Sequence, residues 1–210
     1  MTIIDIHTHR NYPQQGAIVS LSPTQYDKDK SPICSVGIHP WDSIDISNQT
    51  LSLLKELSTL PNVVAIGECG IDRLKGADIE SQTALFKQHI QLSEEVKKPL
   101  IIHAVKSANI ILSLHRQYNP TQTWIIHGYR GNDTTAKQYL SRGIELSYGE
   151  KFNSRALSIT PLEQLWIESD ESTCDINDIY NTVAEILKIE PLILQQSIER
   201  RAKNLFFGCQ

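Results

Sequence analysis

Short apolar runs rich in β-branched residues recur along the whole chain, and amphipathic helical patterns separate most of them. Several of these runs are apolar at nearly every position, as expected of strands that are buried on both faces of a parallel sheet. Alternation of such strands with helices predicts a parallel α/β fold. The eight candidate strands are residues 3–6, 17–21, 33–38, 63–66, 100–102, 124–126, 144–146 and 165–167.

The first two connections, residues 10–16 and 22–32, contain no convincing helix, whereas the later connections do. The candidate helices are residues 49–60, 81–98, 107–118, 134–142, 177–188 and 191–206. Eight strands with this spacing predict a TIM (β/α)8 barrel. It is trimmed and lacks full helices after its first two strands, because 210 residues fall short of the roughly 250 that are typical of this fold. The chain has no internal repeats or linkers, so the prediction is one domain over residues 1–210. His89 lies in a helical pattern and is predicted to be a structural or surface residue.

The composition argues against several classes of protein. The net charge of −4 argues against broad wrapping of nucleic acid. No apolar run approaches the roughly 20 residues of a membrane-spanning helix, and the opening MTIIDIHTHR does not resemble a signal peptide. The four cysteines form no CxxC pair, so a reducing, cytoplasmic setting is predicted. Neither a membrane nor an obligate protein partner is indicated.

Six side chains that can bind a metal lie at the carboxyl-terminal ends of candidate strands. His7 and His9 form an HxH pair, and residues two apart on a strand share a face. That end of a TIM barrel holds the active site. Histidine and carboxylate ligands on separate strands are what a converging metal centre requires. The predicted metal ligands are His7, His9, Glu68, His103, His127 and Asp170.

Six ligands exceed the needs of one tetrahedral cation and indicate two divalent ions, such as Mg2+, Mn2+ or Zn2+. Two ions about 3.5–4 Å apart bind the attacking and the leaving oxygen of a displacement, and they acidify bound water. A carboxylate such as Glu68 can bridge the ions, and Asp170 can accept the proton of the water. Glu68 and Asp170 are therefore the predicted catalytic residues of a metal-dependent hydrolase.

Basic residues follow several candidate strands within a few positions, although the chain as a whole is acidic. Cations placed there suit phosphate oxygens. These basic residues are Arg10, Arg73, Lys106, Arg130 and Lys151. Arg73, Lys106 and Arg130 are predicted to bind substrate, together with His39, which lies in GIHPWD just past the third candidate strand.

An ordered set of motifs resembles the TatD family of metal-dependent deoxyribonucleases, which are amidohydrolase-like barrels. DIHTHR is similar to the family's opening HxH, SVGIHP to its GIHP segment and VVAIGECGID to its GE-x-G-x-D segment. KKPLIIHAVKSA, WIIHGYRGN and LWIESDES resemble its P-x-x-x-H, H-x-F-x-G and E-T-D segments. The resemblance covers almost the whole chain. It implies a two-metal hydrolase that cleaves phosphodiesters, often at DNA ends, with the six residues above as ligands, Glu68 as the bridge and Asp170 as the base.

The chain departs from this pattern where the family shapes access to substrate. Lys106 stands in place of an arginine, Tyr129 replaces phenylalanine, and a proline- and arginine-containing arm after Asp170 is missing. Three functions therefore remain open. The leading one is a nuclease or phosphodiesterase whose substrate is single-stranded or terminal DNA or a small phosphodiester. The alternatives are a hydrolase of an amide, ester or lactone, and a metal-binding protein without turnover.

Overall fold

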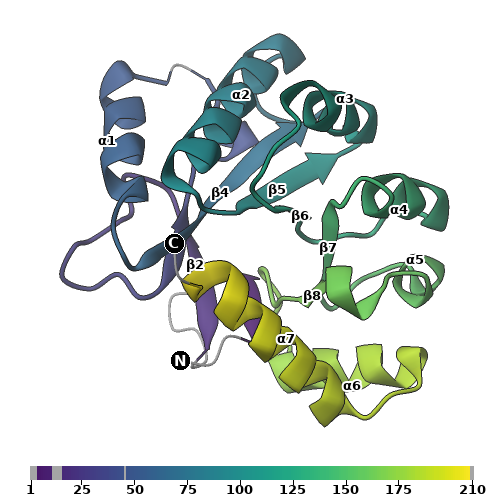
Figure 1. Cartoon of the computed structure of the whole chain (residues 1–210). Helices are drawn as coiled ribbons and strands as arrows, with labels where there is room; N and C mark the ends of the chain where they lie inside the picture. The colour runs from purple at the N-terminus through teal and green to yellow at the C-terminus, as the bar shows by residue number, and fades with distance from the viewer. Residues whose placement is uncertain (1–3, 11–15, 45, 209–210) are drawn as a thin grey trace. The chain divides into compact units, whose positions relative to one another are not determined.

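The computed structural model describes residues 4–10, 16–44 and 46–208 of the chain (Figure 1). In these ranges the strands are β1 (Asp5–Thr8), β2 (Ala17–Leu21), β3 (Cys34–Val36), β4 (Val63–Asp72), β5 (Leu100–Val105), β6 (Trp124–Ile126), β7 (Glu145–Tyr148) and β8 (Leu165–Ile167). The helices are α1 (Asn48–Ser58), α2 (Ile79–Val96), α3 (Ala108–Tyr118), α4 (Asp133–Leu140), α5 (Ser154–Ser158), α6 (Ile176–Leu187) and α7 (Pro191–Phe207), with short 3-10 helices η1 (Pro40–Asp42) and η2 (Leu162–Gln164). The strands follow one another from β1 to β8 in one sheet, which confirms the predicted (β/α)8 fold class.

Each predicted strand and helix overlaps an observed element, and the main differences lie at strand ends. β4 continues to Asp72 and β5 to Val105, whereas the apolar pattern ended at Ile66 and Ile102. Residues 22–32 form turns without a helix, as predicted, while residues 11–15 of the first connection lie outside the described residues. The short helix α5 was not predicted. None of the helices described is long and apolar enough to cross a membrane.

Two compact units divide the chain. One contains residues 20–124, and the other contains the residues up to Val19 together with those from Ile125 onward. The prediction of a single domain stays a prediction.

In the unit of residues 20–124, β3, β4 and β5 form a parallel ladder. Helix α2 packs along β4 (Figure 1). Every residue of β4 is buried. The side chain of Gln82 on α2 closes the end of this strand, because its Oε1 accepts the Asp72 N–H at 2.8 Å and its Nε2 donates to the Asp72 carbonyl at 3.0 Å. Helix α2 begins where the Asp78 carboxylate caps the Ser81 N–H, and it ends at Lys97 in the left-handed conformation. These contacts fix the carboxyl end of β4, where polar residues gather.

In the other unit, β1 lies between β2 and the end of β8, and β6, β7 and β8 form a second ladder. The Asp170 N–H donates to the His7 carbonyl at 2.9 Å, and the Asp170 carbonyl accepts the His9 N–H at 3.1 Å. These two hydrogen bonds hold Asp170 against the HxH pair. Arg201 of α7 ties the helix layer to the ladder through an ion pair with Glu145 at 2.7 Å.

Candidate metal centre

One group of metal-capable side chains lies in the unit of residues 20–124 and is called here the His39 cluster: His39, Glu68 and His103. Glu68 Oε1 lies 2.7 Å from His103 Nδ1 and 3.0 Å from His39 Nε2. One ligand atom from each residue falls within 4.8 Å of the others, which fits coordination of a single ion. Glu68 is buried in β4, and His103 lies in β5 rather than at its end.

Backbone packing explains the glycines around Glu68. A Cβ on Gly70, whose φ is +140°, would lie 2.1 Å from the His103 carbonyl oxygen. A Cβ on Gly67, at φ +147°, would lie 2.5 Å from the Ile101 carbonyl oxygen. Only glycine therefore lets β4 approach β5 closely enough to bring Glu68 and His103 together.

Asp72 and Trp41 hold the far side of His103. Asp72 Oδ2 lies 3.2 Å from His103 Nε2 and accepts the Trp41 indole N–H at 2.7 Å. Burial raises the pKa of Asp72, but hydrogen bonds from Trp41, the Leu74 N–H and His103 outweigh burial and leave the pKa below its ordinary value. Such a carboxylate behind a histidine orients the ring for a metal. Sequence reasoning singled out Asp72 only as part of a motif and gave Trp41 no role.

A second group, called here the His7 cluster, lies in the other unit and consists of His7, His127 and Asp170. One ligand atom from each of these residues again falls within 4.8 Å of the others. His7 Nε2 lies 4.0 Å and His9 Nε2 lies 3.9 Å from Asp170 Oδ1, and the His7 and His127 ring centroids are 4.3 Å apart. His7 is fully buried, whereas the His9 side chain is 37% exposed. The HxH pair therefore presents one inner and one outer imidazole to the same carboxylate.

Glu168 supports the His7 cluster from within the core and was missed by sequence reasoning. Its Oε1 accepts the Gly128 N–H at 2.6 Å and lies 3.4 Å from His127 Nδ1. Burial raises the pKa of Glu168, but His127, His7 and Ser147 outweigh burial and lower the pKa below its ordinary value. In the sequence, Glu168 directly follows the apolar run of residues 165–167, which does not set it apart from other glutamates near strand ends.

Asp5 and Ser169 form a further buried pair under the cluster. Ser169 donates to Asp5 from its N–H at 3.0 Å and from its hydroxyl at 2.6 Å. Burial raises the pKa of Asp5 to about 7, although the bonds from Ser169 act in the opposite direction. The pair joins β1 to the segment that carries Asp170.

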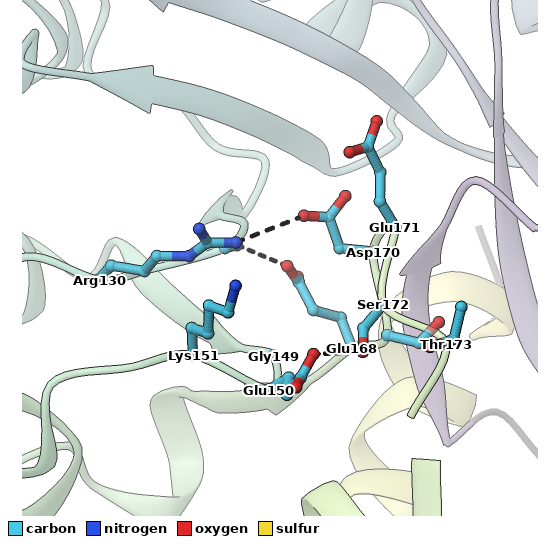
Figure 2. A pocket seen from close by; sticks show the side chains of 11 residues that line it. Arg130, Gly149, Glu150, Lys151, Glu168, Asp170, Glu171, Ser172 and Thr173 are labelled. Atoms are coloured by element: carbon cyan, nitrogen blue, oxygen red, sulfur yellow. Dashed lines mark hydrogen bonds and ion pairs between the residues drawn. The ribbon is translucent and has the colours of Figure 1, made fainter. Parts of the chain in front are cut away.

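A pocket of about 390 Å3 opens beside Asp170 (Figure 2). Arg130 reaches across it, with Nη2 at 3.9 Å from Asp170 Oδ2, and Lys151 also lines it. The remaining lining residues are Gly128, Gly149, Glu150, Glu168, Ser169, Glu171, Ser172 and Thr173. Two cations thus face several carboxylates in the same hollow.

The other predicted cationic residues differ in their surroundings. Arg73 and Lys106 are exposed, and the Arg73 N–H donates to the Val105 carbonyl at 3.1 Å, which brings the two side chains onto neighbouring strand ends. Arg10 instead donates from Nε to the Ser172 carbonyl at 2.9 Å and also contacts the Cys174 carbonyl. Its guanidinium therefore holds the loop after Asp170.

The (β/α)8 strand order and histidine–carboxylate clusters at the carboxyl ends of strands are the arrangement of metal-dependent hydrolases built on TIM barrels. The chain belongs to the TatD-related DNase family, whose model matches residues 19–207.

Two curated proteins with similar sequences carry different names. An uncharacterized metal-dependent hydrolase of Buchnera aphidicola subsp. Baizongia pistaciae is 30% identical over 151 residues, which cover 68% of this chain and 57% of the relative. The 3'-5' ssDNA/RNA exonuclease TatD of Erwinia billingiae is 24% identical over 199 residues, which cover 82% of this chain and 76% of the relative. The chain thus spans less than two thirds of the length of the Buchnera relative.

Among solved structures, YJJV, a TatD homolog from Escherichia coli K12, matches with a TM-score of 0.82 at 19% identity and covers 97% of both chains. A TatD family hydrolase from Entamoeba histolytica matches with a TM-score of 0.77 at 17% identity and covers 99% of both chains. At these identities the likeness establishes the fold.

Proposed function

We propose that the chain is a divalent-metal-dependent hydrolase that cleaves phosphodiester bonds of single-stranded or terminal DNA. The observation that carries the proposal is the pair of clusters, each of which combines two histidines with one carboxylate within 4.8 Å. Nitrogen and carboxylate donors at this spacing suit Zn2+ or Mn2+. The names of the relatives, metal-dependent hydrolase and 3'-5' ssDNA/RNA exonuclease, point the same way.

Each cluster offers enough donors for one ion. In the His39 cluster the ligands are His39, Glu68 and His103; in the His7 cluster they are His7, His127 and Asp170, with His9 beside Asp170. His39 was predicted to bind substrate, and its 3.0 Å approach to Glu68 favours the role of a ligand. When bound, divalent ions supply Lewis acidity, which makes water a better nucleophile and neutralises charge on a phosphate.

The remaining catalytic roles are assigned to side chains of the protein. Asp170 is the proposed general base, because its carboxylate is partly exposed, faces the pocket and is held by backbone hydrogen bonds to the HxH segment. Glu68 is the proposed second catalytic carboxylate. Asp72 and Glu168 orient His103 and His127 from behind.

The basic residues favour a phosphate substrate over a neutral one. Arg130 in the pocket and the exposed Arg73 and Lys106 can donate to phosphate oxygens. Charge that develops on these oxygens during cleavage is stabilised more than charge in the ground state, which is the requirement for catalysis. A neutral ester or lactone gains less from the same cations.

The test is a cleavage assay on metal-depleted protein that is reloaded separately with Mg2+, Mn2+ or Zn2+. The substrates are end-labelled single-stranded DNA, a small phosphodiester and a neutral ester. The proposal expects metal-dependent cleavage of both phosphodiesters. Turnover of the ester alone would establish the alternative hydrolase, and metal binding without turnover of any substrate would establish a binding protein. Cell fractionation would test the separate prediction of a cytoplasmic location.

A further inference from the structure

Trp41 differs from the other two tryptophans of the chain in its exposure. Trp124 and Trp166 are each 1% exposed, whereas Trp41 is 40% exposed. A hydrogen bond nevertheless holds the orientation of the ring, because the indole N–H donates to Asp72 Oδ2 at 2.7 Å. The indole thus offers apolar surface to solvent in one defined orientation.

This exposed ring adjoins the His39 cluster. Its centroid lies 4.6 Å from that of the His39 ring and 5.8 Å from that of the His103 ring. Leu74, which follows Asp72 by two positions, is 65% exposed and adds apolar surface to the loop after β4. The exposed Trp41 and Leu74 side chains thus form an apolar surface beside the His39 cluster, and burial in the protein core does not account for it.

Basic residues lie against the Trp41 ring and at the ends of β4 and β5. The Lys75 ammonium lies over the Trp41 ring, 3.3 Å from its centroid. Arg73 and Lys106 are exposed at the neighbouring ends of β4 and β5. An aromatic ring with cations beside it is the combination that binds single-stranded nucleic acid, because the base stacks and the cations follow the backbone.

We propose that Trp41 is a stacking platform for one nucleobase of a single-stranded substrate and that Lys75 binds an adjacent phosphate. The proposal rests on the proposed function and adds a specificity-determining contact to it. A cation–π contact at an exposed position is weaker than stacking of a base on an aromatic ring. The incoming strand therefore displaces the Lys75 ammonium from the ring, and a phosphate accepts it.

The experiment measures binding without cleavage, using protein held in EDTA. Oligo(dT) and an abasic oligomer of equal length and charge are titrated while tryptophan fluorescence is followed. Because the other two tryptophans are buried, quenching reports Trp41. Oligo(dT) is expected to quench the emission and to bind about tenfold more tightly than the abasic oligomer. Equal binding of the two oligomers, or binding of oligo(dT) without quenching, would overturn the proposal.

Variants separate stacking from charge, with anisotropy of labelled oligomers as the readout. Trp41→Leu should weaken oligo(dT) binding about tenfold and leave abasic binding unchanged, while Trp41→Phe should restore binding without the indole hydrogen bond. Lys75→Ala should weaken the binding of both oligomers. It should also reduce the slope of log binding constant against log salt concentration by about 0.7. Lys55→Ala is the matched control, because this exposed lysine pairs with Glu95 on the helices. Wild-type affinity of Trp41→Leu for oligo(dT) would refute the platform.

A cleavage assay separates failure of the stacking platform from failure of the proposed nuclease function. If metal-loaded protein cleaves oligo(dT) and the abasic oligomer equally well and Trp41→Leu changes neither rate, the platform is refuted while the nuclease stands. If oligo(dT) quenches Trp41 but no oligomer is cleaved with any metal, the nuclease is refuted while the platform is supported.

Discussion

Asp170 combines an unusual backbone conformation with a central position in its cluster. Its φ is +52°, in the left-handed region, and its N–H and carbonyl are both bonded to the HxH segment. Its carboxylate faces His7, His9 and Arg130 at about 4 Å. The backbone therefore fixes this carboxylate independently of its charge.

For that reason Asp170→Asn should remove turnover and keep the fold. Asparagine tolerates the left-handed conformation, but its amide cannot accept the proton of an attacking water. Activity should fall at least about 10²-fold, while the melting temperature without metal changes little. Asp178→Asn, an exposed change on α6, is the control. Turnover near the wild-type value in Asp170→Asn would remove Asp170 from the mechanism.

Charge removal at the two cations tests the substrate class. Arg130→Ala combined with Lys106→Ala should lower kcat/KM on a phosphodiester about tenfold or more, because charge-assisted bonds to phosphate are lost. Hydrolysis of a neutral ester, if the protein has any, should be nearly unaffected. Equal losses on both substrates would show that these residues do not recognise phosphate.

The predicted metal ligands stand out in the sequence because they lie at the ends of apolar runs, whereas His39 was predicted to bind substrate and the supporting residues gave no such signal. Glu168 looks like any glutamate near a strand end until its contacts with His127 and Gly128 are seen. From the sequence alone Trp41 looks like a core residue, since aromatic side chains are usually buried. Its exposure and its bond to Asp72 depend on the path of the η1 turn, which no periodicity encodes.

At the scale of elements, the ends of β4 and β5 escaped prediction for a related reason. Their last residues, GECGID and HAV, are mostly polar or small, so the apolar pattern stops early although the ladder continues through the Gly70–His103 and Asp72–Val105 pairs. Where a strand carries polar metal ligands, its hydrophobicity no longer indicates that the strand continues. The apolar halves of the same strands were placed correctly.

Gly70→Ala should damage this ladder. The new Cβ would meet the His103 carbonyl at 2.1 Å and would sit at a φ of +140°. A loss of about 2–4 kcal/mol in the free energy of unfolding is expected from the clash and the strain. Gly143→Ala is a matched control, with φ +77° and no atom within 4 Å, and should cost only about 1 kcal/mol. Similar urea midpoints for the two variants would contradict the close approach of the strands.

His89 connects α2 to the end of β3 and should make stability depend on pH. Its buried Nε2 accepts the Ile38 N–H at 3.0 Å, and burial lowers its pKa to about 4 although the Leu85 carbonyl acts in the opposite direction. The unfolded chain then binds more protons than the folded chain between about pH 6.5 and 4, so stability is complete above this window and is lost as the pH falls through it. The contribution is about 3 kcal/mol.

Urea unfolding from pH 7 to pH 4 measures this effect. His89→Leu should flatten the pH dependence and cost about 1–3 kcal/mol at pH 7, because the Ile38 N–H loses its acceptor. His89→Gln, which retains an acceptor but does not titrate, should flatten the curve at a smaller cost. An unchanged slope in both variants would assign the pH dependence to other groups.

At the scale of the whole molecule, the two clusters predict how metal and stability are linked. Wild-type protein should bind two divalent ions, and an ion present at about 100 times its Kd should add about 2.7 kcal/mol of stability. His127→Ala and His39→Ala should each reduce the stoichiometry to one, since His127 belongs to the His7 cluster and His39 to the His39 cluster. Elemental analysis and melting curves with and without chelator test this. Loss of both ions in either single variant would contradict one ion per cluster.

The pairing of β1 with the end of β8, through Thr8 and Asp170, bears on how the chain is made. A ribosome releases the HxH segment first and its partner carboxylate more than a hundred residues later. β1 can therefore pair with β2 early, but its other side has no partner until Asp170 has emerged. At about 5–20 residues per second the wait lasts on the order of ten seconds. Residues 20–124 meet no such delay, because their ladder uses strands that emerge consecutively. We therefore expect this middle segment to gain protection from protease on stalled nascent chains while the segment that contains His7 and His9 is still cleavable.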